Sequence, residues 1–500
     1  MTIHFPHTRR SDTLSSRVFG IDPRALAAFR IGLGILLLID LWVRAADLGA
    51  HYALGRVVSD SALQALRPWA YPSLHALSSA IEWQVALFVI AALLAVALAV
   101  GYRSRLAAFG SWMLLLSLHH ANPLINNSGD SILLLMLLWG GFLPLGTCLS
   151  LDARRRGTPP AEGPVFSIAT AGVLLQLYAV YLTSIFHKTG ATWRSDFTAV
   201  YYTLELDAFT TAFGKLVGDA PLPVLQALTI ATLVLEGIGP LIAMSPWRSA
   251  TARTLVALSF IGFHAGLAAS MTLGIFPFVC MVGWLLVIPS PVWQAVFRRA
   301  RSLGPLRPPS HAELHPVLSA AALFLILGAG LLNWREADPI GTHYAFGDGA
   351  EIIDRIGYQV GISQPWDMFS PNPASEDGWY EIVGTTAHGD KYSLPNGDSY
   401  RPTGRNEASA SYVSQRWRKL LFDYYRTDAF AQHRAEYGAY LWNDWNRRHP
   451  DRPLQSIEIA IHHEPTPEPG VDSSLERRIL LTYEEPPLHA RRDPTTSHRP

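Results

Sequence analysis

The sequence predicts a membrane protein of the all-α class, a transmembrane bundle of about nine helices followed by a small extracytoplasmic α+β domain. Two observations support this prediction. First, the apolar residues, 49% of the 500, are concentrated in the first two thirds of the chain. Runs of 17 or more mostly apolar residues, long enough to cross ~30 Å of hydrocarbon, recur there. Second, the last third is polar and carries segments with the alternation of β-strands.

The first predicted span is a retained helix. Its apolar run begins near residue 25 and contains Arg30 and Asp40, which does not fit a cleavable signal peptide. The nine predicted spans are residues 25–43, 82–101, 106–121, 131–149, 165–187, 222–245, 254–272, 274–290 and 316–333.

The distribution of basic residues predicts the orientation. With the N-terminus inside, the inner segments carry 15 arginines, and the outer connections carry six arginines and lysines. Residues 1–24 are therefore expected in the cytoplasm, and residues 335–485 form the extracytoplasmic domain after the 25–334 membrane domain. The expected location is a bacterial cytoplasmic membrane.

The polar tail is expected to combine strands and helix. Residues 378–394 have the pattern of a β-hairpin, residues 456–463 and 477–485 that of two more strands, and residues 412–448 are helix-like and rich in aromatic residues. Residues 486–500 lack apolar content, which predicts disorder. Within the membrane domain, residues 195–220 and 291–301 have the spacing of surface helices.

Several functional classes are disfavoured by the sequence. The net charge is zero without a basic patch, so no nucleic-acid partner is expected. Cys148 and Cys280 lie inside apolar runs and form no CxxC pair. His119 and His120 are adjacent, point about 100° apart on a helix and are unsuited to one metal, so no metal is predicted. No internal repeat supports a transporter. The expected partners are the lipid bilayer and, as a candidate substrate, a peptide or protein, and the oligomeric state stays open.

Lys188 is the first candidate functional residue. It ends an apolar run in the stretch YLTSIFHKTGATW, and the 40 basic residues of the chain include only three other lysines. Arginine reaches a membrane surface equally well, but only lysine readily loses its proton when partly buried. Lys188 is therefore a candidate base, and the alternative is an anchor at the membrane surface.

Other ionisable residues gather at the predicted outer ends of the spans. Charged groups in membrane helices usually face the bundle interior or a cavity. Two further ionisable residues lie nearer the middle of their spans, and each has a structural alternative. His264 could form a hydrogen bond between helices, and Glu236, near Gly239 and Pro240, could cap the amides of a broken helix. The residues at the outer ends are Asp40, His119, His120, Asp130 and His187.

Five ordered blocks resemble the horizontally transferred transmembrane (HTTM) domain family, whose eukaryotic relative is the vitamin K-dependent γ-glutamyl carboxylase. The blocks are LAAFRIGLGILLLIDLW (26–42), NPLINNSGD (122–130), FHKTGATW (186–193), FHAGLAASMTLGIFPFV (263–279) and FSPNPASEDGW (369–379). The carboxylase has a tryptophan five residues after its catalytic lysine, as Trp193 follows Lys188. It also has a histidine ten residues before a Gly-x-Phe-Pro, as His264 precedes Gly274.

The resemblance implies lysine-base chemistry at the outer membrane face. Lys188 would deprotonate a reduced quinone similar to vitamin K hydroquinone, leading to quinol oxygenation (epoxidation) or carboxylation. Residues expected to line the cavity are His187, His264, Asp130, Asn127, Asp40, Trp193 and His120.

The chain departs from the carboxylase at three places. Ser128 stands where the carboxylase has a histidine, His187 where it has a lysine, and the tail lacks a segment that matches the propeptide-binding surface. Two hypotheses therefore stay open. The chain is an enzyme that handles a quinone or a peptide substrate, or it is a non-catalytic membrane scaffold that binds a secreted peptide or helps its maturation or export.

Overall fold

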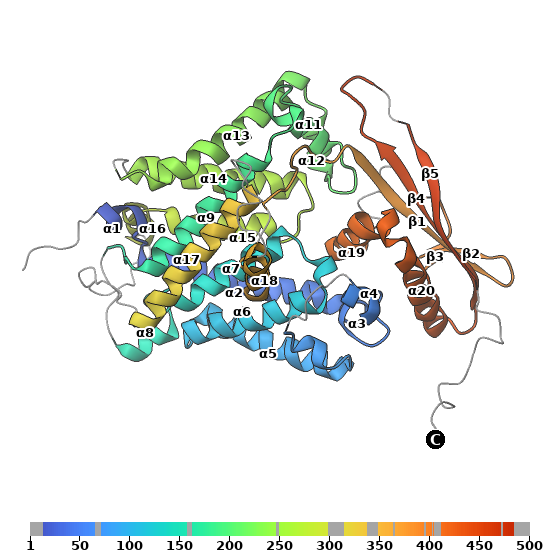
Figure 1. Ribbon diagram of the computed structural model, residues 1–500, viewed down its shortest axis with the longest axis horizontal. Helices are drawn as coiled ribbons and strands as arrows, with labels where there is room; N and C mark the ends of the chain where they lie inside the picture. Colours follow the sequence, from blue (N-terminus) through green and yellow to red (C-terminus); the bar gives the residue numbers. More distant parts are fainter. Residues whose placement is uncertain are drawn as a thin grey trace, which may run out of the picture.

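The computed structural model shows a helical body joined to a five-stranded sheet (Figure 1). It describes residues 14–65, 72–157, 163–246, 250–298, 315–337, 349–363, 366–394, 397–402, 404, 412–471 and 474–484. The predicted disordered tail, residues 486–500, lies outside the described residues.

The helices of the helical body are α1 (Leu14–Phe19), α2 (Pro23–Ala46), α3 (Leu48–Tyr52), α4 (Asp60–Ala65), α5 (Ile81–Val100), α6 (Ser104–Ala121), α7 (Ser128–Phe142), α8 (Leu151–Arg156), α9 (Ile168–His187), α10 (Ala191–Arg194), α11 (Ala199–Leu204), α12 (Ala212–Gly218), α13 (Leu222–Met244), α14 (Ala250–Ser270), α15 (Phe276–Trp284), α16 (Ser290–Arg298), α17 (Pro316–Ala337) and α18 (Gly349–Val360). In the helical body α5 packs on α2 and α6, α6 packs on α7, and α17 and α13 both pack on α9.

Each predicted span falls on a helix, but the count of nine crossings is not confirmed. Six helices of the described chain, α2, α5, α9, α13, α14 and α17, are long and apolar enough to cross a membrane. A seventh crossing results if α15 and α16, which meet at a bend of 99°, are one span. The 15 residues of α7 extend only about 22 Å, and α6 includes Arg105, His119 and His120. Length and composition therefore support six or seven crossings, and the crossings predicted at α6 and α7 stay predictions.

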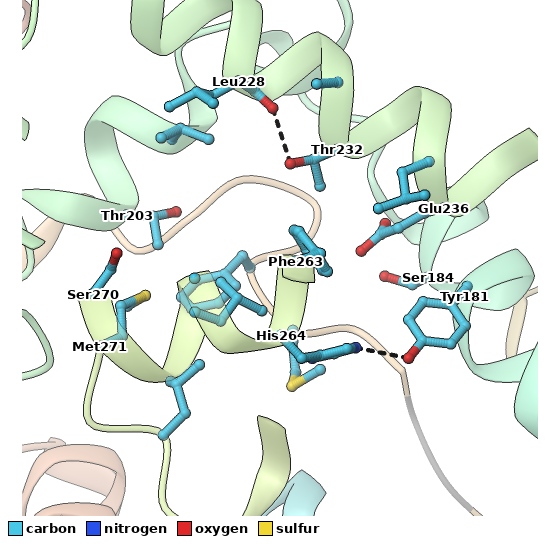
Figure 2. Close-up of a pocket in the computed structure, with 18 of the residues that line it drawn as sticks. Tyr181, Ser184, Thr203, Leu228, Thr232, Glu236, Phe263, His264, Ser270 and Met271 are labelled. Carbon is cyan, nitrogen blue, oxygen red and sulfur yellow. Dashed lines mark hydrogen bonds between the residues drawn. The ribbon is translucent and has the colours of Figure 1, made fainter. Parts of the chain in front are cut away.

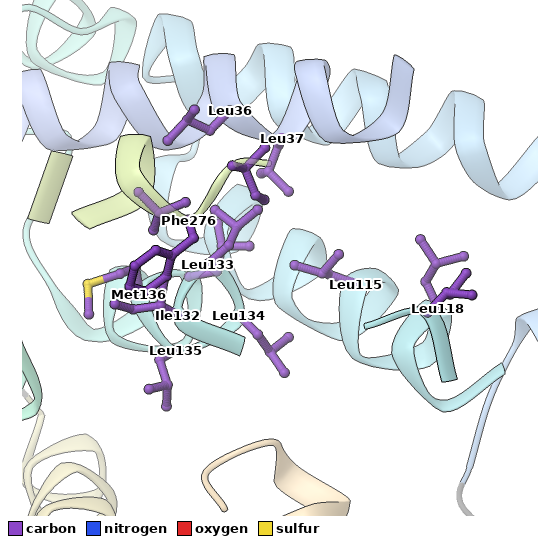
Figure 3. Close-up of a cluster of buried hydrophobic side chains, with 14 of the residues drawn as sticks. Leu36, Leu37, Leu115, Leu118, Ile132, Leu133, Leu134, Leu135, Met136 and Phe276 are labelled. Atoms are coloured by element: carbon purple, nitrogen blue, oxygen red, sulfur yellow. The ribbon is translucent and has the colours of Figure 1, made fainter. Parts of the chain in front are cut away.

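Helix α7 forms the centre of the bundle. Its sequence SILLLMLLW is apolar on every face, which predicts burial all round. Leu133 and Met136 lie beside Leu36 and Leu37 of α2 and Phe276 of α15 (Figure 3). The N-terminus of α7 is closed by a capping box, in which Asn127 accepts from the amides of Gly129 and Asp130 and the Asp130 carboxylate accepts from the Asn127 amide.

The surface segments are shorter than predicted. Residues 195–220 contain two short helices, α11 and α12, joined by a turn, and the Thr211 side chain caps the start of α12 by accepting from the Gly214 amide. Residues 290–298 form α16, as expected for the second amphipathic segment.

The C-terminal part contains an antiparallel sheet of order β3-β2-β1-β4-β5. The strands are β1 (Glu376–Thr386), β2 (Lys391–Ser393), β3 (Asp398–Ser399), β4 (Leu454–Pro465) and β5 (Glu476–Glu484), and Ile382 of β1 stands opposite Ile459 of β4. Between β3 and β4, the helices α19 (Gln415–Leu420) and α20 (Arg434–Arg448) lie between the sheet and the bundle (Figure 1).

A buried ion network connects α19 to the bundle. Arg416 of α19 contacts Asp40 of α2 at 2.5 Å and Asp130 of α7 at 2.9 Å. Arg44 of α2 pairs with the same two carboxylates at 2.8 Å each. Two guanidinium groups thus balance two carboxylates, which is how buried charges are normally tolerated.

Candidate functional site

A cavity of about 350 Å³ lies in the helical body between α9, α13 and α14. Figure 2 shows Glu236 and Thr232 of α13 facing Phe263 and His264 of α14 across it, with Tyr181 and Ser184 of α9 at one side. The segment 366–369, which follows α18, contributes Trp366, Met368 and Phe369 to its wall. Most of the lining is apolar, so the few polar side chains in it are the candidates for binding or chemistry.

Lys188 lines this cavity and is paired with Glu236. Lys188 is the C-cap of α9, and its side chain is only 4% exposed. The ammonium donates to Glu236 Oε2 and lies 4.7 Å from the centre of the Trp193 ring. Because an ammonium has no lone pair, the proton acceptor in this ion pair is the Glu236 carboxylate.

The loop after Lys188 is held by the segment that follows α18. Trp193 Nε1 donates to the carbonyl oxygen of Phe369 at 2.8 Å, and the Gly190 amide donates to the carbonyl oxygen of Pro371 at 2.9 Å. A Cβ at Gly190 would lie 2.0 Å from Asn372 Oδ1, so a larger residue there would displace the Asn372 side chain. Two blocks of sequence almost 180 residues apart, FHKTGATW and FSPNP, therefore position the lysine together.

His264 belongs to a second polar group of the cavity. Its Nε2 is 2.7 Å from the Tyr181 hydroxyl, which also accepts a hydrogen bond of 2.9 Å from Trp284 Nε1. Trp284 stacks on Phe260 with ring centroids 3.9 Å apart, which fixes the indole. His264 Nδ1 has no hydrogen-bond partner among the described residues. The predicted structural alternative for His264, a hydrogen bond between helices, is present because the histidine contacts α9 through Tyr181.

The cavity opens between α13 and α14 toward the apolar surface of the body. Gly262 and Gly266 of α14 line it, are exposed, and have no atom within 4 Å of an added Cβ. Leu228 of α13 also lines it and is 41% exposed. The outer faces of both helices carry further exposed apolar side chains, among them Val234, Ile238, Leu255 and Leu258. The wall of the cavity on this side is therefore formed by exposed glycine and apolar residues of α13 and α14.

The predicted cavity residues are brought together only in part. Lys188, Trp193 and His264 line the same cavity. Asn127 lines a separate hollow of about 290 Å³, which shares Phe276 and Phe369 with the first cavity.

The four other predicted residues line neither the cavity nor this hollow. Asp40 and Asp130 are occupied by Arg44 and Arg416 in the ion network. The ring of His120 lies between the carbonyl oxygens of Pro72 and Tyr358, at 3.0 and 3.3 Å. His187 precedes Lys188 by one residue at the end of α9 and faces another direction. Depth in the membrane, from which these positions were inferred, does not specify the direction of a side chain.

Glu236 and Tyr181 are the site residues that the sequence reasoning missed. Glu236 was named as an ionisable residue of a membrane helix, with a cap of a broken helix as its structural alternative, but it was not among the residues expected to line the cavity. The alternative does not apply, because α13 runs unbroken from Leu222 to Met244 through Pro240. The available signal was a single carboxylate in a long apolar helix, which requires a partner of opposite charge. Tyr181 gave no signal, since an aromatic residue in an apolar run is ordinary core.

These features define a class: a membrane protein with a buried lysine–glutamate pair in the wall of a mostly apolar cavity. The model of the HTTM domain family matches residues 20–293, more than half of the chain. The chain therefore belongs to the HTTM family, as the five sequence blocks indicated. Comparisons with curated proteins and with solved structures give no match. Among the described residues, no group of histidine, cysteine, aspartate and glutamate side chains is arranged to hold a metal ion.

Proposed function

We propose that the chain is a membrane enzyme that removes a proton from a hydroxyl group of a lipophilic, quinol-like substrate at the Lys188–Glu236 pair. The observation that supports it most is the position of this pair, buried in the wall of an apolar cavity that opens toward lipid. Buried ionisable groups in such a cleft are typical of active sites.

The cavity suits a reduced quinone. Its aromatic lining, Trp193, Phe263, Phe276, Trp366 and Phe369, offers ring faces and edges for a planar head group. Its opening between α13 and α14 accommodates an isoprenoid tail that stays in lipid. A reduced quinone, when bound, supplies an acidic phenolic hydroxyl and two electrons.

The ion pair gives the expected lysine base a partner. In the paired form, the Glu236 carboxylate accepts a proton, and Lys188 obtains a lone pair when its own proton moves to Glu236. The Lys188 ammonium also stabilises negative charge that develops on a neighbouring oxygen, in a site from which water is largely excluded. Trp193 and Glu236 hold the amine in place for both roles.

The chemistry proposed to follow is oxygenation of the quinol or a carboxylation, at the extracytoplasmic face, by analogy with the related carboxylase. A peptide is the corresponding candidate for a second substrate.

Turnover of a reduced quinone by the purified full-length chain in nanodiscs tests the proposal. We expect Lys188→Arg and Glu236→Gln each to lower the rate of product formation by about 100-fold or more, because each removes one half of the proton-transfer pair. Lys215→Arg is the matched control, since Lys215 forms a partly exposed ion pair with Asp207 away from the site and should keep full activity.

Unchanged turnover in Lys188→Arg would contradict the proposal. It would favour the scaffold hypothesis, in which the protein binds a secreted peptide or helps its maturation or export. A mass-spectrometric search of the producing cell for peptides that gain the mass of carbon dioxide in a Lys188-dependent manner separates carboxylation from oxygenation alone.

A further inference from the structure

A second cavity, of about 390 Å³, lies where the C-terminal domain meets the end of α2. Helix α20 presents one face to it, through Tyr437, Tyr440 and Asp444, which recur at helical spacing. The other face of α20 packs on the sheet, since Gly438 lies against Leu481 and Tyr483 of β5. The cavity is separate from the one that contains Lys188, with which it shares no lining residue.

Three aromatic rings form much of the wall. The indole of Trp417 on α19 lies 5.9 Å from the ring of Tyr437 and 6.0 Å from that of Tyr440, with interplanar angles of 40° and 44°. Trp417 Nε1 has no hydrogen-bond partner among the described residues, although the side chain is buried. Inclined aromatic rings around one space are the arrangement that attracts organic cations through the negative charge of the ring faces.

Carboxylates add negative charge to the same space. Asp444 is neutralised by Arg447 and Arg448, the second of which also lines the cavity. Asp47 has no cation within ion-pair distance in the described part of the chain, and its carboxylate accepts only a hydrogen bond of 3.2 Å from Ser414 Oγ. Burial, followed by the charges of Asp444 and Asp47, raises the pKa of Tyr440 to about 12, which places both carboxylates within electrostatic reach of the ring.

We propose that this cavity binds an alkylated ammonium group, such as the trimethylammonium of choline, between Trp417, Tyr437 and Tyr440, with Asp47 as its counter-ion. An alkylated ammonium is weakly hydrated and has no need of many hydrogen-bond acceptors, so aromatic faces and one carboxylate satisfy it. A small metal ion would need several oxygen ligands, and the cavity offers only one unpaired carboxylate.

The position of the cavity allows two sources for this group. Asp47 is the C-cap of α2, a helix long enough to span a membrane, so the cavity lies at the level where lipid head groups are expected. The ammonium therefore belongs either to a phospholipid head group or to a free solute.

Isothermal titration of the purified full-length chain in maltoside detergent tests the proposal, with choline as the probe. We expect saturable binding of choline, and at least tenfold weaker binding of dimethylbutanol, its uncharged isostere, because the positive charge is the recognised feature. Asp47→Asn should weaken choline binding about tenfold. Asp398→Asn, an exposed carboxylate on β3, should not.

A second variant covers the case in which Asp47→Asn disturbs folding. Tyr440→Leu keeps an apolar side chain but removes a ring face, and it should weaken choline binding about tenfold while dimethylbutanol binding stays unchanged. Absence of saturable choline binding, equal affinity for choline and dimethylbutanol, or full affinity in both variants would overturn the proposal.

Nanodiscs of different composition identify the source. If lipid head groups occupy the cavity, the apparent affinity for added choline falls in phosphatidylcholine discs relative to phosphatidylglycerol discs. Equal affinity in the two kinds of disc identifies a free solute as the ligand. Both outcomes support an ammonium site.

Discussion

At the scale of single residues, six of the buried charged side chains are organised in ion pairs. Lys188 is matched by Glu236, and Arg44 and Arg416 are matched by Asp40 and Asp130. A buried charge without a partner is costly, so each pair constrains which helices are neighbours. The Lys188 pair differs from the others because it borders a cavity, whereas the arginine network is enclosed by protein.

Asp377 is a buried carboxyl group that forms no ion pair within the part of the chain that the structure describes. It lies at the start of β1, is 3% exposed, and accepts a hydrogen bond of 3.1 Å from the Ala208 amide. Burial raises its pKa to about 6 from the usual 3.8. Its contribution to stability is therefore complete below pH 4 and declines as the pH rises through 6, since the folded state then holds an unfavourable charge.

Asp377→Asn should stabilise the protein at high pH. At pH 8 we expect a gain of about 1–3 kcal/mol, which should disappear below pH 4, where the native carboxyl group is also neutral. Thermal unfolding of the detergent-purified chain across this pH range measures it. Asp390→Asn, an exposed group in the turn before β2, serves as control and should leave the pH profile unchanged. A gain of equal size at both pH values would show that charge is not the cause.

At the scale of secondary-structure elements, α13 and α14 control access to the Lys188 cavity. Gly266→Trp should narrow the opening between them and raise the apparent KM for a tailed quinol about tenfold. The substitution does not weaken the helix itself, since glycine is the poorer helix former.

Ala265→Trp is the matched control for this experiment. Ala265 is exposed on the same helix but does not line the cavity, so its replacement should leave KM unchanged. Equal effects of the two tryptophans, measured as KM in nanodiscs, would argue against access between α13 and α14.

Helix α19 depends on the bundle through Arg416. Arg416→Gln leaves Asp40 and Asp130 with one guanidinium group instead of two, so we expect a loss of about 3–5 kcal/mol and earlier proteolytic release of the C-terminal domain. Arg447→Gln, which breaks a pair that is 76% exposed on the arginine side, should change stability by less than about 0.5 kcal/mol. Similar melting temperatures for both variants would contradict the role given to the network.

At the scale of the whole molecule, the charge distribution predicts that the sheet domain is extracytoplasmic. A cysteine in place of Ser474, near β5, should react with a membrane-impermeant maleimide in intact cells. A cysteine in place of Arg154, on α8, should react only after permeabilisation. Background labelling should be low because Cys148 and Cys280 are both buried. The reverse pattern of labelling would invert the orientation and place the Lys188 site toward the cytoplasm.

The sequence by itself determined the membrane class, the positions of the apolar helices, the strands of the tail and the HTTM family. These are local properties, because length, hydropathy and alternation are read within one segment. The scarcity of lysine in the sequence also made Lys188 a candidate functional residue. The crossings that the sequence predicted at α6 and α7 are not confirmed, since the burial of these helices depends on neighbouring helices.

Only the tertiary structure decided which charges meet. Lys188 and Glu236 are separated by 48 residues and Asp40 and Arg416 by 376, so no spacing rule relates them. Asp40 and Asp130 have the residue type and the predicted depth expected of residues that line the cavity. The packing of α19 nevertheless brings Arg416 against them, so they belong to a structural ion network. The physical reason is that the direction of a side chain and the choice of its partner depend on how the elements pack against one another. Hydropathy along the chain carries no information about this packing.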